Sequence, residues 1–134
     1  MADPSYRRGA QAGVFSSHPP TILIVDDEPF IVDLLALALE DEGYQVSRAY
    51  DGEQAWSSVC KRRPDLIISD VSMPRLDGLD LLNRLRQRRG LARIPVILMS
   101  AARRSVDIPN TVFIPKPFDL DRLLSLVQAE LAVA

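Results

Sequence analysis

From residue 21 onward, short runs of apolar residues alternate with longer stretches in which apolar and polar residues mix. Four of these runs are almost entirely apolar, and they span residues 22–25, 66–69, 96–99 and 112–115. Runs of this length and composition are typical of strands buried on both faces of a parallel sheet. A fifth run, residues 45–49, alternates apolar and polar positions, which indicates a short edge strand.

The stretches between the runs have the periodicity of helices. Pro29 suits the first position of a helix that ends at Gly43. Asp51 and Gln54 form a capping-box pattern before a second helix, which Pro64 stops. The pattern predicts that these apolar residues face the sheet: Phe30, Ile31, Leu34, Leu35 and Ala38 in the first helix, and Ala55, Trp56, Val59 and Cys60 in the second.

A third helix is predicted after Gly78 and a last one after Asp119, which caps it. Only 11 residues lie between Ser100 and Val112, and a crossover with a full helix needs at least about 10–12. The helix in this connection is therefore expected to be shortened or missing. Inward residues are predicted as Leu79, Leu82 and Leu85, then Leu120, Leu123, Leu124, Val127 and Leu131; Arg84, Arg86, Arg88 and Arg89 are predicted to point outward.

These alternating elements predict an α/β fold with a doubly wound, five-stranded parallel sheet. The chain is long enough for one domain with a core, and we expect a flexible N-terminal tail over residues 1–19 and the domain over residues 20–134. A net charge of −2 favours neither nucleic acid nor membrane. The single cysteine excludes an internal disulfide. With no secretory core and no apolar stretch near about 20 residues, we expect a cytoplasmic chain without membrane insertion.

Polar side chains follow four of the predicted strands. Asp26 and Asp27 follow the first, Asp70 the third, Ser100 ends the fourth, and Lys116 follows the fifth. If the strand order is 2-1-3-4-5, as in flavodoxin-like sheets, the first and third strands flank the point where ligands bind. Three carboxylates would meet there and repel one another unless a cation intervenes. Oxygen ligands of this kind suit Mg²⁺, and the charged lysine can pair with a carboxylate or a phosphoryl oxygen.

Three segments resemble the signatures of receiver domains of response regulators. They are Ile-Leu-Ile-Val-Asp-Asp-Glu-Pro at residues 22–29, Pro-Asp-Leu-Ile-Ile-Ser-Asp-Val-Ser-Met-Pro-Arg-Leu-Asp-Gly at 64–78, and Phe-Ile-Pro-Lys-Pro-Phe at 113–118. The resemblance covers about residues 20–132. It implies a single-domain response regulator that accepts a phosphoryl group from a histidine kinase or a phosphotransfer protein. The chain would then signal to a downstream protein by a conformational switch.

The resemblance also implies a role for each site residue. Asp70 would be the phosphoacceptor and Lys116 would pair with the phosphoryl group. Asp27 would bind Mg²⁺ directly, Asp26 mostly through water, and the backbone carbonyl of Ser72 would complete the protein ligands together with Asp70. Ser100 would be the switch hydroxyl and Phe113 the switch aromatic, although Phe113 is also a plausible core residue. A cis bond between Lys116 and Pro117 would aim the lysine inward.

Two other functions fit parts of the pattern. A docking module that keeps the motifs but signals without phosphorylation is favoured only by the short connection after Ser100. A phosphatase with an aspartate nucleophile needs a second acid two residues later, and that position is Ser72. We therefore expect no enzymatic activity other than self-phosphorylation and slow self-dephosphorylation. Direct DNA binding is not expected, because the arginines after Gly78 lack interleaved aromatic residues.

Overall fold

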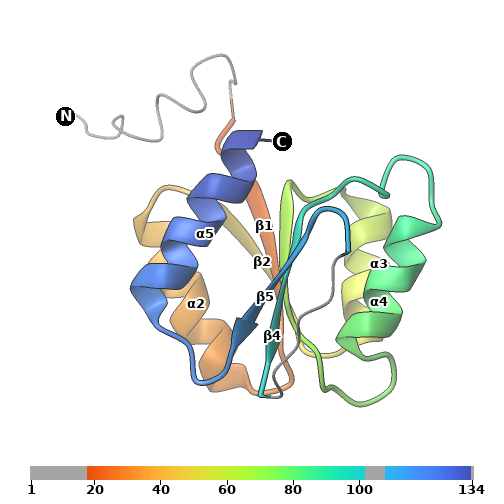
Figure 1. The fold of residues 1–134 in the computed structure, drawn as a ribbon, viewed down its shortest axis with the longest axis horizontal. Helices are drawn as coiled ribbons and strands as arrows, with labels where there is room; N and C mark the ends of the chain where they lie inside the picture. The colour runs from red at the N-terminus through yellow and green to blue at the C-terminus, as the bar shows by residue number, and fades with distance from the viewer. Residues whose placement is uncertain (1–17, 102–107, 134) are drawn as a thin grey trace.

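The computed structural model describes residues 18–101 and 108–133. Five strands and four helices follow one another along this part of the chain (Figure 1). In chain order they are β1 (Thr21–Val25), α2 (Pro29–Asp41), β2 (Gln45–Ala49), α3 (Gly52–Lys61), β3 (Leu66–Asp70), α4 (Gly78–Arg86), β4 (Val96–Ser100), β5 (Thr111–Pro115) and α5 (Leu120–Val133).

All neighbouring strands are parallel, and their order is β2-β1-β3-β4-β5. The predicted doubly wound, flavodoxin-like fold is therefore confirmed. Helices α2 and α5 cover one face of the sheet, and α3 and α4 cover the other (Figure 1). Because every strand runs in the same direction, all of the carboxyl ends lie at one edge, which is the lower edge in this view.

The core has two halves, one on each side of the sheet, because successive strand residues point to opposite faces. Leu23 and Val25 pack with residues of α3 and α4, whereas Ile22 and Ile24 pack with residues of α2 and α5. Strands β3 and β4 are buried along their whole length. This two-sided burial explains why their sequences are almost continuously apolar.

The predicted inward face of α2 was partly wrong. Leu35 is buried as expected, but Phe30 is 75% exposed and Leu34 is 39% exposed. The residues that pack against the sheet are Val32, Leu35, Ala36 and Leu39. Apolar residues occur on every side of this helix, so their spacing did not single out one face.

Two predictions for α3 and α4 were also wrong. Cys60 is exposed rather than part of the buried stripe of α3. Arg86 is not solvated, because its guanidinium donates to the carbonyl oxygens of Ala92, Ile94 and Asn110 at 2.9–3.0 Å. This side chain instead ties the end of α4 to the segments that lead into β4 and β5.

The predicted shortening or loss of a helix between β4 and β5 concerns residues that are largely outside the described ranges, since residues 102–107 are not described. The predicted tail over residues 1–19 likewise falls almost wholly outside them. Among the residues that are described, no helix is long and apolar enough to cross a lipid bilayer.

Candidate functional site

The carboxyl edge of the sheet brings together the acidic residues that the sequence predicted to meet. Asp26 and Asp27 directly follow β1, and Asp70 is the last residue of the neighbouring strand β3. One carboxylate oxygen of each lies within 4.8 Å of those of the other two. The predicted convergence of the three carboxylates is therefore what the fold produces.

Lys116, which directly follows β5, bridges two of these carboxylates. Its Nζ lies 3.1 Å from Oδ2 of Asp26 and 3.4 Å from Oδ2 of Asp70. Asp26 is fully buried, and its Oδ1 accepts a hydrogen bond from the backbone N–H of Glu28 at 2.9 Å. Both oxygens of Asp26 therefore have donors, which is how a buried carboxylate is normally accommodated.

Burial and neighbouring charges shift the pKa values of Asp70 and Lys116. Burial, reinforced by the negative charges of Asp26 and Asp27, raises the pKa of Asp70 despite the nearby ammonium of Lys116. Burial alone would lower the pKa of Lys116, but the hydrogen bond and charge of Asp26, together with Asp70, outweigh it and raise that pKa. The lysine is thus held as a cation, while Asp70 is a carboxylate at some electrostatic cost.

The donor set suits a hard divalent cation. Three carboxylates supply only oxygen ligands, and Asp27 is exposed, which leaves room for water in the coordination sphere. A single ammonium cannot neutralise three carboxylates, so a bound cation would relieve the remaining repulsion. Oxygen ligands with open positions for water are the environment in which proteins bind Mg²⁺. The acidic cluster is therefore chemically fitted to hold a metal ion.

The other predicted site residues lie on β4, on β5 and in the loop after β3. Ser72 is exposed in the loop between β3 and α4. Ser100 ends β4, is buried, and its carbonyl accepts a hydrogen bond from the N–H of Lys116 at 2.9 Å. The peptide bond between Lys116 and Pro117 is cis, as the sequence suggested. Phe113 is partly buried and packs against the core half beneath α3 and α4.

One contact of the loop after β3 could not be predicted from the sequence. Arg75, in the loop that carries Ser72, donates from Nη1 to Oδ2 of Asp51 at 2.8 Å. Asp51 was expected only as the cap of α3, and that role is confirmed by its hydrogen bond from the N–H of Gln54 at 2.8 Å. A charged pair separated by 24 positions leaves no local pattern from which it could have been predicted.

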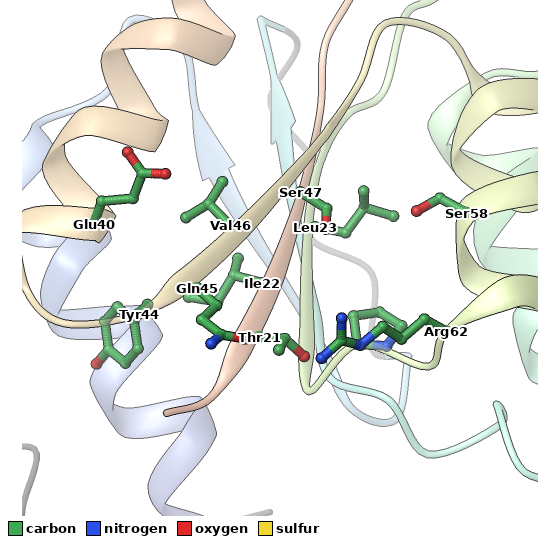
Figure 2. Close-up of a pocket in the computed structure, with 11 residues that line it drawn as sticks. Thr21, Ile22, Leu23, Glu40, Tyr44, Gln45, Val46, Ser47, Ser58 and Arg62 are labelled. Atoms are coloured by element: carbon green, nitrogen blue, oxygen red, sulfur yellow. The ribbon is translucent and has the colours of Figure 1, made fainter. Parts of the chain in front are cut away.

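A hollow lies at the opposite end of the sheet, where the strands begin (Figure 2). It has a volume of about 410 Å³ and begins at Thr21 and Gln45, the first residues of β1 and β2. Among the described residues that line it, Glu40 and Arg62 are the charged ones. None of the residues predicted to carry chemistry lies there, so the acidic edge is the candidate site.

Residues 22–128 match the family model described as the response regulator receiver domain. Response regulator GtcR of Aneurinibacillus migulanus is 44% identical over 117 residues, which are 83% of this chain and 47% of that protein. RpaA of Synechocystis sp., named a DNA-binding dual master transcriptional regulator, is 36% identical over 116 residues, 82% of this chain and 48% of RpaA. The chain thus spans about half the length of these curated relatives.

Among solved structures, the signal receiver domain of a signal transduction histidine kinase from Syntrophus aciditrophicus is similar to this chain. The TM-score is 0.79 at 36% identity, and the match covers 86% of this chain and 92% of that one. The comparisons do not support the expectation that direct DNA binding is absent, since RpaA is itself named as DNA-binding.

Proposed function

Because the chain belongs to the family of response regulator receiver domains of two-component signalling, we propose that Asp70 accepts a phosphoryl group from a histidine kinase or a phosphotransfer protein. One observation carries this proposal. Carboxylates from β1 and β3 meet within 4.8 Å, and an ammonium that follows β5 contacts two of them. A nucleophile, a site for a cation and a fixed positive charge therefore occupy the same edge of the sheet.

Of the two buried carboxylates, Asp70 is better suited than Asp26 to act as the nucleophile. Asp26 is fully buried and both of its oxygens already accept hydrogen bonds, so it cannot reach a phosphoryl donor. In the transfer, a carboxylate oxygen of Asp70 forms a bond to phosphorus as the bond between phosphorus and the donor's imidazole nitrogen breaks. The electron pair of that bond stays on the imidazole.

Lys116 has two successive roles in this proposal. Before transfer it pairs with Asp26 and Asp70, which holds its ammonium beside the nucleophile. After transfer, a phosphoryl oxygen replaces the Asp70 carboxylate as its partner, while Asp26 keeps the lysine in place. The raised pKa of Lys116 ensures that this group is positively charged throughout the neutral range.

Asp27, Asp70 and the backbone carbonyl of Ser72 are the proposed direct ligands of Mg²⁺, and Asp26 is proposed to act mostly through water. When bound, the ion offsets the negative charge of the phosphoryl oxygens during transfer. The oxygen-only donor set and the exposure of Asp27 support this assignment. With Ser72 in place of a second acid, the site has no general acid for the turnover of external phosphate esters, and slow self-dephosphorylation is the expected hydrolysis.

Ser100 and Phe113 are the proposed output residues. Ser100 lies at the end of β4, next to the strand that leads to Lys116, so its hydroxyl can respond to a phosphoryl group on Asp70. Phe113 is partly buried on the adjacent strand and packs against the core half beneath α3 and α4. Phosphorylation would shift the population between two arrangements of β4 and β5 that a downstream protein distinguishes.

The test is the intact mass of the protein after incubation with Mg²⁺ and acetyl phosphate. The expected result is one added phosphoryl group, which is absent from Asp70→Asn and from a sample treated with a chelator. Asp33→Asn serves as the matched control, because Asp33 is an exposed carboxylate on α2. A phosphoryl group that persists in Asp70→Asn, or a wild type that stays unmodified, would refute the proposed acceptor.

A further inference from the structure

The loop between β3 and α4, residues 71–77, is tied to the start of α3 by an ion pair. Arg75 Nη1 lies 2.8 Å from Oδ2 of Asp51. Only 6% of Asp51 is exposed, and its Oδ1 accepts the N–H of Gln54 as the cap of α3. This nearly buried carboxylate therefore uses one oxygen for its own helix and the other for the neighbouring loop.

Two backbone contacts hold the same loop. Gly52, the first residue of α3, packs so closely against Leu76 that a Cβ at position 52 would lie 1.9 Å from the carbonyl oxygen of Leu76. The loop is closed on itself by a hydrogen bond from the N–H of Gly78 to the carbonyl of Val71 at 2.8 Å. Leu76 therefore packs against the start of α3, and the two ends of the loop are joined by a hydrogen bond.

The backbone of Arg75 is in the left-handed region, with φ of 67°. This conformation is unfavourable for residues with a Cβ, and glycine or asparagine occupies it at lower cost. The chain places an arginine there, and the side chain it gains reaches Asp51. Backbone strain beside a candidate site is a reason to look for a contribution of the arginine side chain that glycine could not make.

The Arg75–Asp51 pair is connected through the backbone to residues on two sides of the acidic cluster. On one side, the loop of Arg75 contains Ser72, whose carbonyl is a proposed ligand of Mg²⁺. On the other side, Asp51 follows β2 closely, and the carbonyl of Ala49 at the end of β2 accepts the N–H of Asp26 at 3.2 Å. The ion pair therefore joins the two loops that border the carboxylates.

We propose that Arg75 is a positioning residue, which acts through its pairing with Asp51 to hold the carbonyl of Ser72 at the cation site. The inference rests on the proposed function, since it concerns the affinity of that site for Mg²⁺. Partners behind the ligands of a metal site commonly change its affinity by 10- to 100-fold when mutated. Arg75 acts on a backbone ligand through a loop, so about a 3- to 10-fold effect is expected.

Long-range electrostatics makes the opposite prediction for one of the two partners. Removing the positive charge of Arg75 would strengthen Mg²⁺ binding, and removing the negative charge of Asp51 would weaken it. Positioning predicts that both changes weaken binding, because either one breaks the pair. The signs of the two effects therefore separate the two explanations.

The experiment is isothermal titration of the whole protein with MgCl₂, with wild type compared with Arg75→Asn and Asp51→Asn. Asparagine tolerates the left-handed backbone at position 75 but is too short to reach Asp51, and at position 51 it keeps the acceptor that caps α3. Arg84→Gln is the control, because it breaks the exposed pair with Glu53 between α3 and α4. Melting temperatures are recorded for each variant, and Arg75→Lys provides a variant that keeps the charge.

The expected result is a 3- to 10-fold larger Kd for Mg²⁺ in both asparagine variants, with Arg84→Gln unchanged and Arg75→Lys nearer to wild type. Stronger binding in Arg75→Asn, or an unchanged Kd in both asparagine variants whether or not they melt earlier, would overturn the positioning role alone. Failure of the wild type itself to bind Mg²⁺ would instead refute the metal site of the proposed function, and the inference with it.

Discussion

Replacing Gly78 with alanine tests how tightly the backbone of Asp70, the proposed phosphoacceptor, is held. Gly78 is the first residue of α4, and a Cβ built there would lie 2.3 Å from the carbonyl oxygen of Asp70 and 2.9 Å from Cα of Val71. Both neighbours are backbone atoms, so no side chain can rotate away. To reach even 3.0 Å from that oxygen, the two segments must separate by about 0.7 Å.

The expected loss of stability is the sum of two destabilising contributions and one stabilising contribution. Forcing an extra methyl into closely packed backbone costs about 1–3 kcal/mol. Weakening the 2.8 Å hydrogen bond from Gly78 to the carbonyl of Val71 costs about 1 kcal/mol more. The better helix propensity of alanine returns at most about 1 kcal/mol. Gly78→Ala should therefore lower the free energy of unfolding by about 2 kcal/mol, or the melting temperature by about 8 °C.

Urea unfolding, followed by the fluorescence of Trp56, measures this change, because Trp56 is the only tryptophan in the sequence. Phosphorylation by acetyl phosphate should also slow by about tenfold, since Asp70, the proposed nucleophile, is displaced by a large fraction of an ångström. Gly90→Ala is the matched control. Its φ of 89° makes alanine strained, but nothing lies within 4 Å of the new Cβ, so stability should fall by about 1 kcal/mol without slowing phosphorylation.

The reasoning would be refuted by a Gly78→Ala protein as stable as wild type, because the helix propensity of alanine would then outweigh the contact with Asp70. A variant that loses about 2 kcal/mol but is phosphorylated at the wild-type rate would retain the packing argument. It would refute the prediction that crowding at Gly78 slows phosphorylation of Asp70.

Three further predictions concern buried charge. The raised pKa of Asp70 means that the folded state binds its proton at higher pH than the unfolded state, so stability falls as the pH rises through that pKa. Without metal, Asp70→Asn should exceed wild type in stability at pH 7.5, and urea titrations should show the gap closing toward pH 4. Lys116→Met leaves the fully buried Asp26 without its cation and should cost about 3–5 kcal/mol in the same assay, partly recovered by Mg²⁺. Arg86→Met removes the donor to three carbonyls and to the hydroxyl of Thr111, and should cost about 3 kcal/mol. Full stability in either of the last two variants would contradict these assignments.

The sequence by itself determined the sheet and the convergence of acidic residues at its edge. Strands buried on both faces are almost entirely apolar, so their positions could be predicted from composition along the chain. Once these strands are parallel, their carboxyl ends must share one edge. Asp26 and Asp70, which are 44 positions apart, could therefore be expected to meet before any contact was seen.

Only the tertiary structure decided which face of α2 is buried and which charged side chains pair. Phe30 and Leu34 are apolar yet exposed, because α2 is apolar on several sides and the sheet covers just one. Arg86 and Arg75 were equally undetermined, since their partners lie 6–25 and 24 positions away, respectively. Periodicity along a chain indicates at best which residues face the core and which face water. A long-range contact between side chains depends instead on the distance between two segments of the folded chain. The fold sets this distance, so it is fixed only after the sheet has assembled.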